Sequence, residues 1–138
     1  ADSWSKENFA GVRLHLGEYK YGIDIQKADL ESLRVLLTEK RDSLLRLLEN
    51  PNLLEHEDFT ELLQAVFHVV EELAVRKELS QLPASDYRHL EDDINRAYSL
   101  LVRQWLDYME HLKEVYPYLF SLAMRTNPFD ETASPIVV

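Results

Sequence analysis

Apolar side chains recur every three or four residues along most of this chain. The longest such run lies within residues 87–112, and its apolar members are Tyr87, Leu90, Ile94, Ala97, Leu101, Trp105, Tyr108 and Leu112. A spacing of three or four residues places side chains on one face of an α-helix. The pattern therefore predicts a helix about 40 Å long, which continues to about Val115 and must pack against other long helices.

Three further stretches with this spacing predict helices over residues 27–49, 58–79 and 117–125. Asp58, with Glu61 three residues later, forms a pattern typical of a helix N-terminus. The fold class is thus predicted to be all-α, a mainly antiparallel bundle of three long helices plus a short C-terminal helix. The residues predicted to form its core are Leu37, Leu44, Leu63, Val66, Phe67, Val70, Leu90, Ile94, Leu101 and Trp105.

Residues 1–25 differ from the rest of the chain, because they hold all three glycines and show another periodicity. Apolar and polar residues alternate on both sides of the pair Gly17-Glu18, as they do in strands. A Gly-X pair between two alternating runs fits a hairpin with a type II′ turn, and an extended arm is the alternative. We expect three parts: an N-terminal arm or hairpin over residues 1–25, a helical bundle over 26–130, and a tail over 131–138.

The composition narrows the range of functions. The 138 residues, 46% of them hydrophobic, are enough for one domain with its own core. A formal net charge of −10 argues against nucleic-acid binding, because the phosphate backbone is also negative. The absence of cysteine excludes disulfides, thiolate metal sites and cysteine nucleophiles.

The chain contains no apolar stretch of the roughly 18 residues that a membrane span needs, so we expect that this segment does not cross a bilayer. Its first residue is Ala1 in place of methionine. This start predicts either a removed methionine or a longer chain with a membrane tether upstream. We expect a cytoplasmic or membrane-tethered soluble domain.

Histidines and carboxylates on helices are the residues from which bundles build metal sites. The candidate ligands in this chain are His68, Glu72, Asp86, His89 and His111. Each histidine also lies beside an apolar stripe, where a solvated or structural role is the commoner one. We therefore expect no bound cofactor and a dispensable metal, and keep a His/carboxylate metal site as the alternative hypothesis.

Catalytic motifs are missing from the sequence. No serine lies in a Gly-x-Ser-x-Gly turn, and there is no phosphate-binding glycine loop. The adjacent carboxylate pairs Glu71-Glu72 and Asp92-Asp93 fit a solvated acidic face. These observations predict that the domain is not an enzyme.

An aromatic segment near the C-terminus is the most distinctive local feature. Its candidate interaction residues are Tyr116, Tyr118, Phe120 and Phe129. Aromatic side chains bring large contact areas with few rotatable bonds, so they favour both cores and interfaces. The segment either caps one end of the bundle or contacts a protein partner or a second copy, and the two roles are compatible.

The C-terminal half resembles a group of uncharacterised bacterial and archaeal proteins. The resemblance covers about residues 50–138 and rests on three motifs: Leu82-Pro83-Ala84-Ser85-Asp86-Tyr87, Arg96-Ala97-Tyr98-Ser99-Leu100-Leu101, and the aromatic segment Tyr116-Pro117-Tyr118-Leu119-Phe120-Ser121-Leu122-Ala123 with Asn127-Pro128-Phe129. It implies a helical soluble domain, often behind an N-terminal membrane anchor, and no catalytic residue. Our first hypothesis is a non-enzymatic interaction or oligomerisation module, and our second is a metal- or cofactor-binding bundle.

Overall fold

The computed structural model describes residues 5–11, 29–54 and 56–137. Every regular element in these ranges is a helix, which confirms the all-α fold class. The alternating segment for which a hairpin or an extended arm was predicted, residues 12–25, lies outside the described residues. Within the predicted arm, residues 6–11 are helical.

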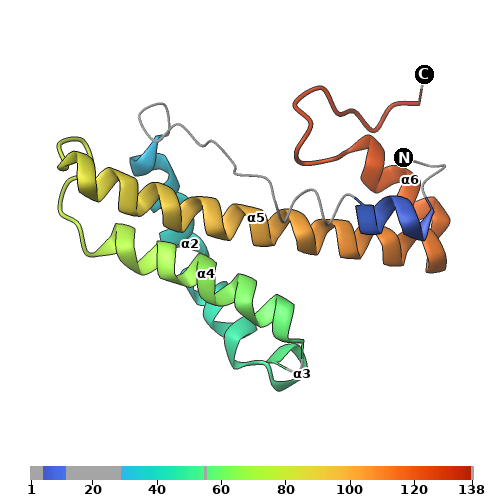
Figure 1. Cartoon of the computed structure of the whole chain (residues 1–138), viewed down its shortest axis with the longest axis horizontal. Coiled ribbons are helices and arrows are strands. Elements are labelled where there is room, and N and C mark those ends of the chain that lie inside the picture. Colours follow the sequence, from blue (N-terminus) through green and yellow to red (C-terminus); the bar gives the residue numbers. More distant parts are fainter. Residues whose placement is uncertain (1–4, 12–28, 55, 138) are drawn as a thin grey trace. The chain divides into compact units, whose positions relative to one another are not determined.

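Five further helices follow in the described part of the chain (Figure 1). They are α2 (Leu30–Glu49), α3 (Pro51–Leu54), α4 (Glu57–Ala74), α5 (Ala84–Val115) and α6 (Pro117–Arg125). None of these helices is long and apolar enough to cross a membrane. The bounds of α6 are those predicted, because Pro117 starts the helix and Asn127-Pro128 follows its end.

Helix α4 ends at Ala74, five residues earlier than predicted. Two arginine side chains satisfy carbonyl groups of its last turn. Arg34 of α2 donates to the carbonyl oxygen of Leu73 at 3.2 Å, and Arg76 folds back onto the carbonyl oxygen of Glu72. The carbonyl groups of Glu72 and Leu73 are therefore paired where the helix ends, and Leu79, which was predicted to be helical, is buried in the connector instead.

The chain divides into two compact units, Lys20–Leu101 and Ala1–Tyr19 with Val102–Val138. Helix α5 contributes to both. The first unit contains α2, α3, α4 and the beginning of α5 around one apolar cluster, whose buried members are Leu30, Val69, Leu73, Leu79 and Leu90. The ranges predicted for arm, bundle and tail are not tested by this division and stay predictions.

Neighbouring helices of the first unit are antiparallel. Arg34 of α2 contacts the end of α4 at Leu73, and Arg41 lies 3.1 Å from Glu71. Residues later in α2 therefore contact residues earlier in α4. Residues 75–83 connect α4 to α5. The Tyr87 hydroxyl orders this connector, since it donates to the Leu79 carbonyl at 2.6 Å and accepts from the Leu82 N–H at 3.3 Å.

The second unit has its own apolar cluster. Phe9 of the helical segment 6–11 and Phe120 of α6 are buried there among three side chains from the last turns of α5, Leu106, Met109 and Leu112. A salt bridge of 3.2 Å between Lys6 and Glu114 lies at its edge. The C-terminal aromatic segment is thus packed in part, through Phe120.

Most of the predicted core positions are buried or half-buried, but Leu101 is not. Leu63, Val70 and Leu90 are buried, and the other predicted members except Leu101 are half-buried. Leu101 is 44% exposed, so its predicted place in the core was wrong. The residue lies between the last α5 residue packed on the first cluster, Ala97, and the first packed on the second cluster, Trp105.

Candidate metal centre

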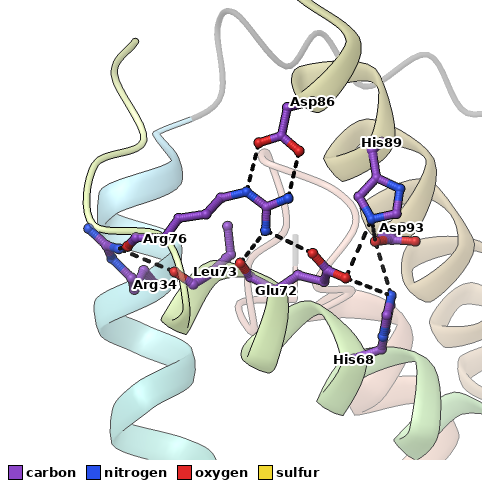
Figure 2. Close-up of polar contacts among 8 residues, drawn as sticks. All are labelled: Arg34, His68, Glu72, Leu73, Arg76, Asp86, His89 and Asp93. Carbon is purple, nitrogen blue, oxygen red and sulfur yellow. Dashed lines mark hydrogen bonds and ion pairs between the residues drawn. The ribbon is translucent and has the colours of Figure 1, made fainter. Parts of the chain in front are cut away.

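Two histidines and two carboxylates from α4 and α5 meet at one point of the first unit (Figure 2). His68 and Glu72 are one turn apart on α4, and His89 and Asp93 are one turn apart on α5. A spacing of four residues places both members of each pair on the same helix face. One ligand atom from each of the four residues lies within 4.8 Å of the other three.

Nitrogen and oxygen atoms alternate around this cluster. Nε2 of His68 lies 3.5 Å from Oε1 of Glu72 and 3.2 Å from Oδ2 of Asp93. Nε2 of His89 lies 3.4 Å and 3.3 Å from the same two oxygens. Each histidine therefore contacts one carboxylate of its own helix and one of the facing helix.

Hydrogen bonds cannot satisfy all four contacts. A ring nitrogen of histidine carries at most one proton, and that proton cannot point at two oxygens equally well. Oδ2 of Asp93 is buried and has no hydrogen-bond partner, although two ring nitrogens lie within 3.3 Å of it. An orphaned buried carboxylate oxygen is costly, and a cation at the centre of the four atoms removes that cost.

The four distances suit a small divalent ion. Zinc binds histidine nitrogen and carboxylate oxygen at about 2.0–2.2 Å, and in a tetrahedron such ligands lie about 3.3–3.6 Å apart. The four nitrogen–oxygen distances of the cluster, 3.2–3.5 Å, are close to this length, and they account for four of the six edges of a tetrahedron. The carboxylates are mostly buried, with 23% and 18% exposure, whereas both histidines are about half exposed and leave a path for an ion to enter.

Arg76 supports the cluster from the side (Figure 2). Its guanidinium binds Asp86 through two hydrogen bonds, at 2.8 Å and 2.6 Å, and donates from Nη1 to Oε2 of Glu72 at 2.8 Å. These hydrogen bonds lower the pKa of both Glu72 and Asp86 below the usual range, and the paired carboxylates raise the pKa of Arg76. Glu72 is thus held ionised with its other oxygen, Oε1, toward the histidines.

The formal charges of this group also suit a divalent cation. Glu72 and Asp93 each contribute −1, and the charges of Arg76 and Asp86 cancel. With neutral histidines the sum is −2, which one divalent ion neutralises. This balance, the orphaned oxygen and the edge lengths are three separate features that fit a bound metal.

The structure places three of the five predicted ligands in the cluster, His68, Glu72 and His89. Asp86 lies outside it, because Arg76 binds both of its oxygens. Asp93 was missed and was assigned to a solvated acidic face together with Glu72, whereas both side chains are mostly buried. The signal that could have found Asp93 is the repeated histidine–x3–carboxylate spacing on the two helices.

His111 belongs to the other unit and contacts Tyr116 edge to face, with ring centroids 6.4 Å apart. The predicted interaction residues divide into two kinds. Tyr116 and Tyr118 are 53% and 92% exposed. Phe120 is buried, with 3% exposure, and Phe129 packs edge to face on Trp105 at 5.5 Å, so these two rings serve the unit itself.

Comparison with known proteins places the chain in a family. The profile of a family described as "Uncharacterized protein MJ1433, C-terminal helical domain" matches residues 1–125. A relative from Methanocaldococcus jannaschii, "Uncharacterized protein MJ1433", is 53% identical over 130 residues, which make up 94% of this chain. The chain spans about half of that relative, 53% of its length. No solved structure matches the chain at a significant level.

Proposed function

The chain belongs to the family of the MJ1433 C-terminal helical domain, and for this member of it we propose that the function is to bind one divalent transition-metal ion. The ligands are His68, Glu72, His89 and Asp93. The observation that carries the proposal is the four-atom cluster in which one carboxylate oxygen, Oδ2 of Asp93, is buried without a hydrogen bond. Two nitrogen and two oxygen ligands favour zinc or a similar first-row ion over magnesium or calcium.

The ion has a structural or regulatory role in this proposal. Four protein ligands fill a tetrahedral zinc site, whereas catalytic zinc sites keep one position for water or substrate. The ligands come from two helices, so a bound ion cross-links α4 to α5 and stabilises the folded first unit. This reading agrees with the absence of catalytic motifs and makes the domain a metal-stabilised, non-enzymatic module.

A zinc titration tests the proposal. We expect the metal-free chain to bind one Zn²⁺ per chain in competition with a chromophoric chelator, and Co²⁺ to give the visible absorption of a tetrahedral complex. His68→Ala and Asp93→Asn should each weaken binding by at least tenfold. His111→Ala and Asp92→Asn are matched controls and should bind as the unsubstituted chain does. Equal affinity in ligand and control variants, or no binding at micromolar zinc, would refute the site.

A second candidate function is association with a protein partner or a second copy through α6. Exposed apolar side chains support it: Tyr118 is 92% exposed, Leu119 51% and Leu122 42%. Leu122 lies four residues after Tyr118 and three after Leu119, so the three side chains lie on one side of the helix. Light scattering at increasing concentration tests self-association, and Tyr118→Ser should lower the apparent mass if α6 forms the contact. A membrane tether upstream stays a prediction.

A further inference from the structure

We infer that Arg76 is the positioning residue of the metal site, and that Asp86 acts on the site only through Arg76. This inference rests on the proposed function, because it concerns the affinity of the same four ligands. Neither residue is a ligand. They form the link between the beginning of α5 and the α4 carboxylate that faces both histidines.

The contacts run in one chain from Asp86 to the ion site. Asp86 fixes the plane of the guanidinium, since Nε and Nη2 of Arg76 bind its two oxygens at 2.8 Å and 2.6 Å. The guanidinium then holds Oε2 of Glu72 at 2.8 Å. With Oε2 fixed, Oε1 faces the two ring nitrogens at 3.5 Å and 3.4 Å. A glutamate without this contact samples several rotamers and must lose that freedom when it binds an ion.

Charge and geometry make opposite predictions for Arg76. Its positive charge repels a metal ion, so a purely electrostatic role predicts tighter zinc binding when the charge is removed. The paired Asp86 cancels most of that charge locally, which leaves the orienting hydrogen bond as the larger effect. Arginine also forms a planar fork that lysine cannot reproduce. We therefore expect replacement of the Arg76 guanidinium to weaken zinc binding, whether or not the new side chain carries a positive charge.

Arg76→Lys keeps the charge and Arg76→Gln removes it. Both should weaken Zn²⁺ affinity by about tenfold, a typical effect of residues that orient metal ligands. Asp86→Asn should weaken it to a similar extent. The double variant Arg76→Gln/Asp86→Asn should lie within about twofold of Arg76→Gln, because both side-chain oxygens of Asp86 are hydrogen-bonded to Arg76.

Arg41→Gln is the matched control. Arg41 pairs with Glu71, the neighbour of Glu72 on α4, at 3.1 Å, but contacts no ligand of the cluster. Its zinc affinity should equal that of the unsubstituted chain. Melting temperatures without zinc show which variants are folded. Should Arg76→Gln unfold, Arg76→Lys and Asp86→Asn still decide the question.

The possible outcomes separate this inference from the proposed function. If the unsubstituted chain binds no zinc, the site itself fails. If it binds zinc while Arg76→Lys and Asp86→Asn bind within twofold of it, the ligands stand and the positioning role is wrong. Tighter binding by Arg76→Gln shows that Arg76 acts by charge alone. An additive double variant shows that Asp86 reaches the ion independently of Arg76.

Discussion

Single leucines on α5 differ in what surrounds them, although the periodic pattern treats them alike. Leu90 is completely buried against Val69 and Leu73 of α4. Leu101 has the same place in the apolar stripe and is 44% exposed. The pattern identifies the face of a helix, but it cannot tell how far along the helix a partner extends.

This difference predicts unequal effects of truncation to alanine. Leu90→Ala should lower the free energy of unfolding by about 2–5 kcal/mol, because it removes buried methylenes and leaves a cavity. Leu101→Ala should lower it by less than about 1 kcal/mol. Urea titrations of the two variants and the unsubstituted chain measure both values. A larger loss for Leu101→Ala than for Leu90→Ala would contradict the packing described for α5.

The proposed metal ligands show the same limit at the residue scale. The sequence indicated His68, Glu72 and His89 as candidates, because bundles build metal sites from histidines and carboxylates on helices. It assigned Asp92 and Asp93, which are adjacent and point to different faces, to a solvated acidic face. Which of the two faces α4 depends on how α5 is rotated against it, which is a tertiary property. Asp86 was also a candidate, and in the structure it pairs with Arg76 of the connector instead.

At the scale of elements, the sequence indicates a helix boundary best where a side chain caps the helix. Asp29 accepts hydrogen bonds from the backbone N–H of Ser32 at 2.9 Å and from its hydroxyl at 2.7 Å, and α2 begins at the next residue, Leu30. The prediction had placed this start at residue 27. The end of α4 was predicted less well, because side-chain contacts of Arg34 and Arg76 with its last carbonyl groups determine it, and Arg34 comes from another helix.

The Asp29 cap makes α2 sensitive to pH. The hydrogen bonds from Ser32 lower the pKa of Asp29 in the folded chain, whereas an unfolded aspartate titrates at about 3.9. A lowered folded pKa stabilises the fold above the unfolded pKa, and the contribution is lost as pH falls through the folded pKa.

We therefore expect Asp29→Ala to melt at a lower temperature than the unsubstituted chain at pH 7, and the difference to narrow below about pH 3.9. Thermal unfolding followed by circular dichroism from pH 2.5 to pH 7 measures it. Asp42→Ala, in the middle of the same helix, is the control for loss of one carboxylate. A difference that grows as pH falls would mean that the carboxylate does not act as a cap.

At the scale of the whole molecule, the fold class and family were accessible from sequence. The all-α fold follows from helical periodicity over most of the chain, and the resemblance to archaeal proteins of unknown role is confirmed by the family match. The division into two compact units was not predicted. One continuous apolar stripe on α5 gave no indication that two separate clusters pack along it.

The two units give the metal proposal a spatial test. The four ligands all belong to the first unit, so zinc should slow amide hydrogen exchange in α4 and in residues 84–101. At a free zinc concentration 100-fold above the dissociation constant, binding stabilises the folded first unit by about 2.7 kcal/mol. Amides whose exchange requires opening of the site should then exchange about a hundredfold more slowly.

Exchange in residues 106–125 should change much less. Asp93→Asn, measured at the same zinc concentration, provides the control. Uniform protection of both units would mean that they open together, and protection confined to residues 106–125 would place the ion elsewhere.

The hydroxyl of Tyr87 has a consequence for proteases. Arg76 and exposed Lys77 make the connector between α4 and α5 a natural target for trypsin, but cleavage requires the backbone to leave its folded path and enter the protease cleft. The hydroxyl binds this backbone at Leu79 and Leu82. Tyr87→Phe, which removes only that oxygen, should speed nicking after Lys77 several-fold, as followed by mass spectrometry of the fragments. The cleaved chain would keep its helices but consist of two fragments. The phenolic oxygen of Tyr87 therefore determines how long the connection between α4 and α5 resists digestion.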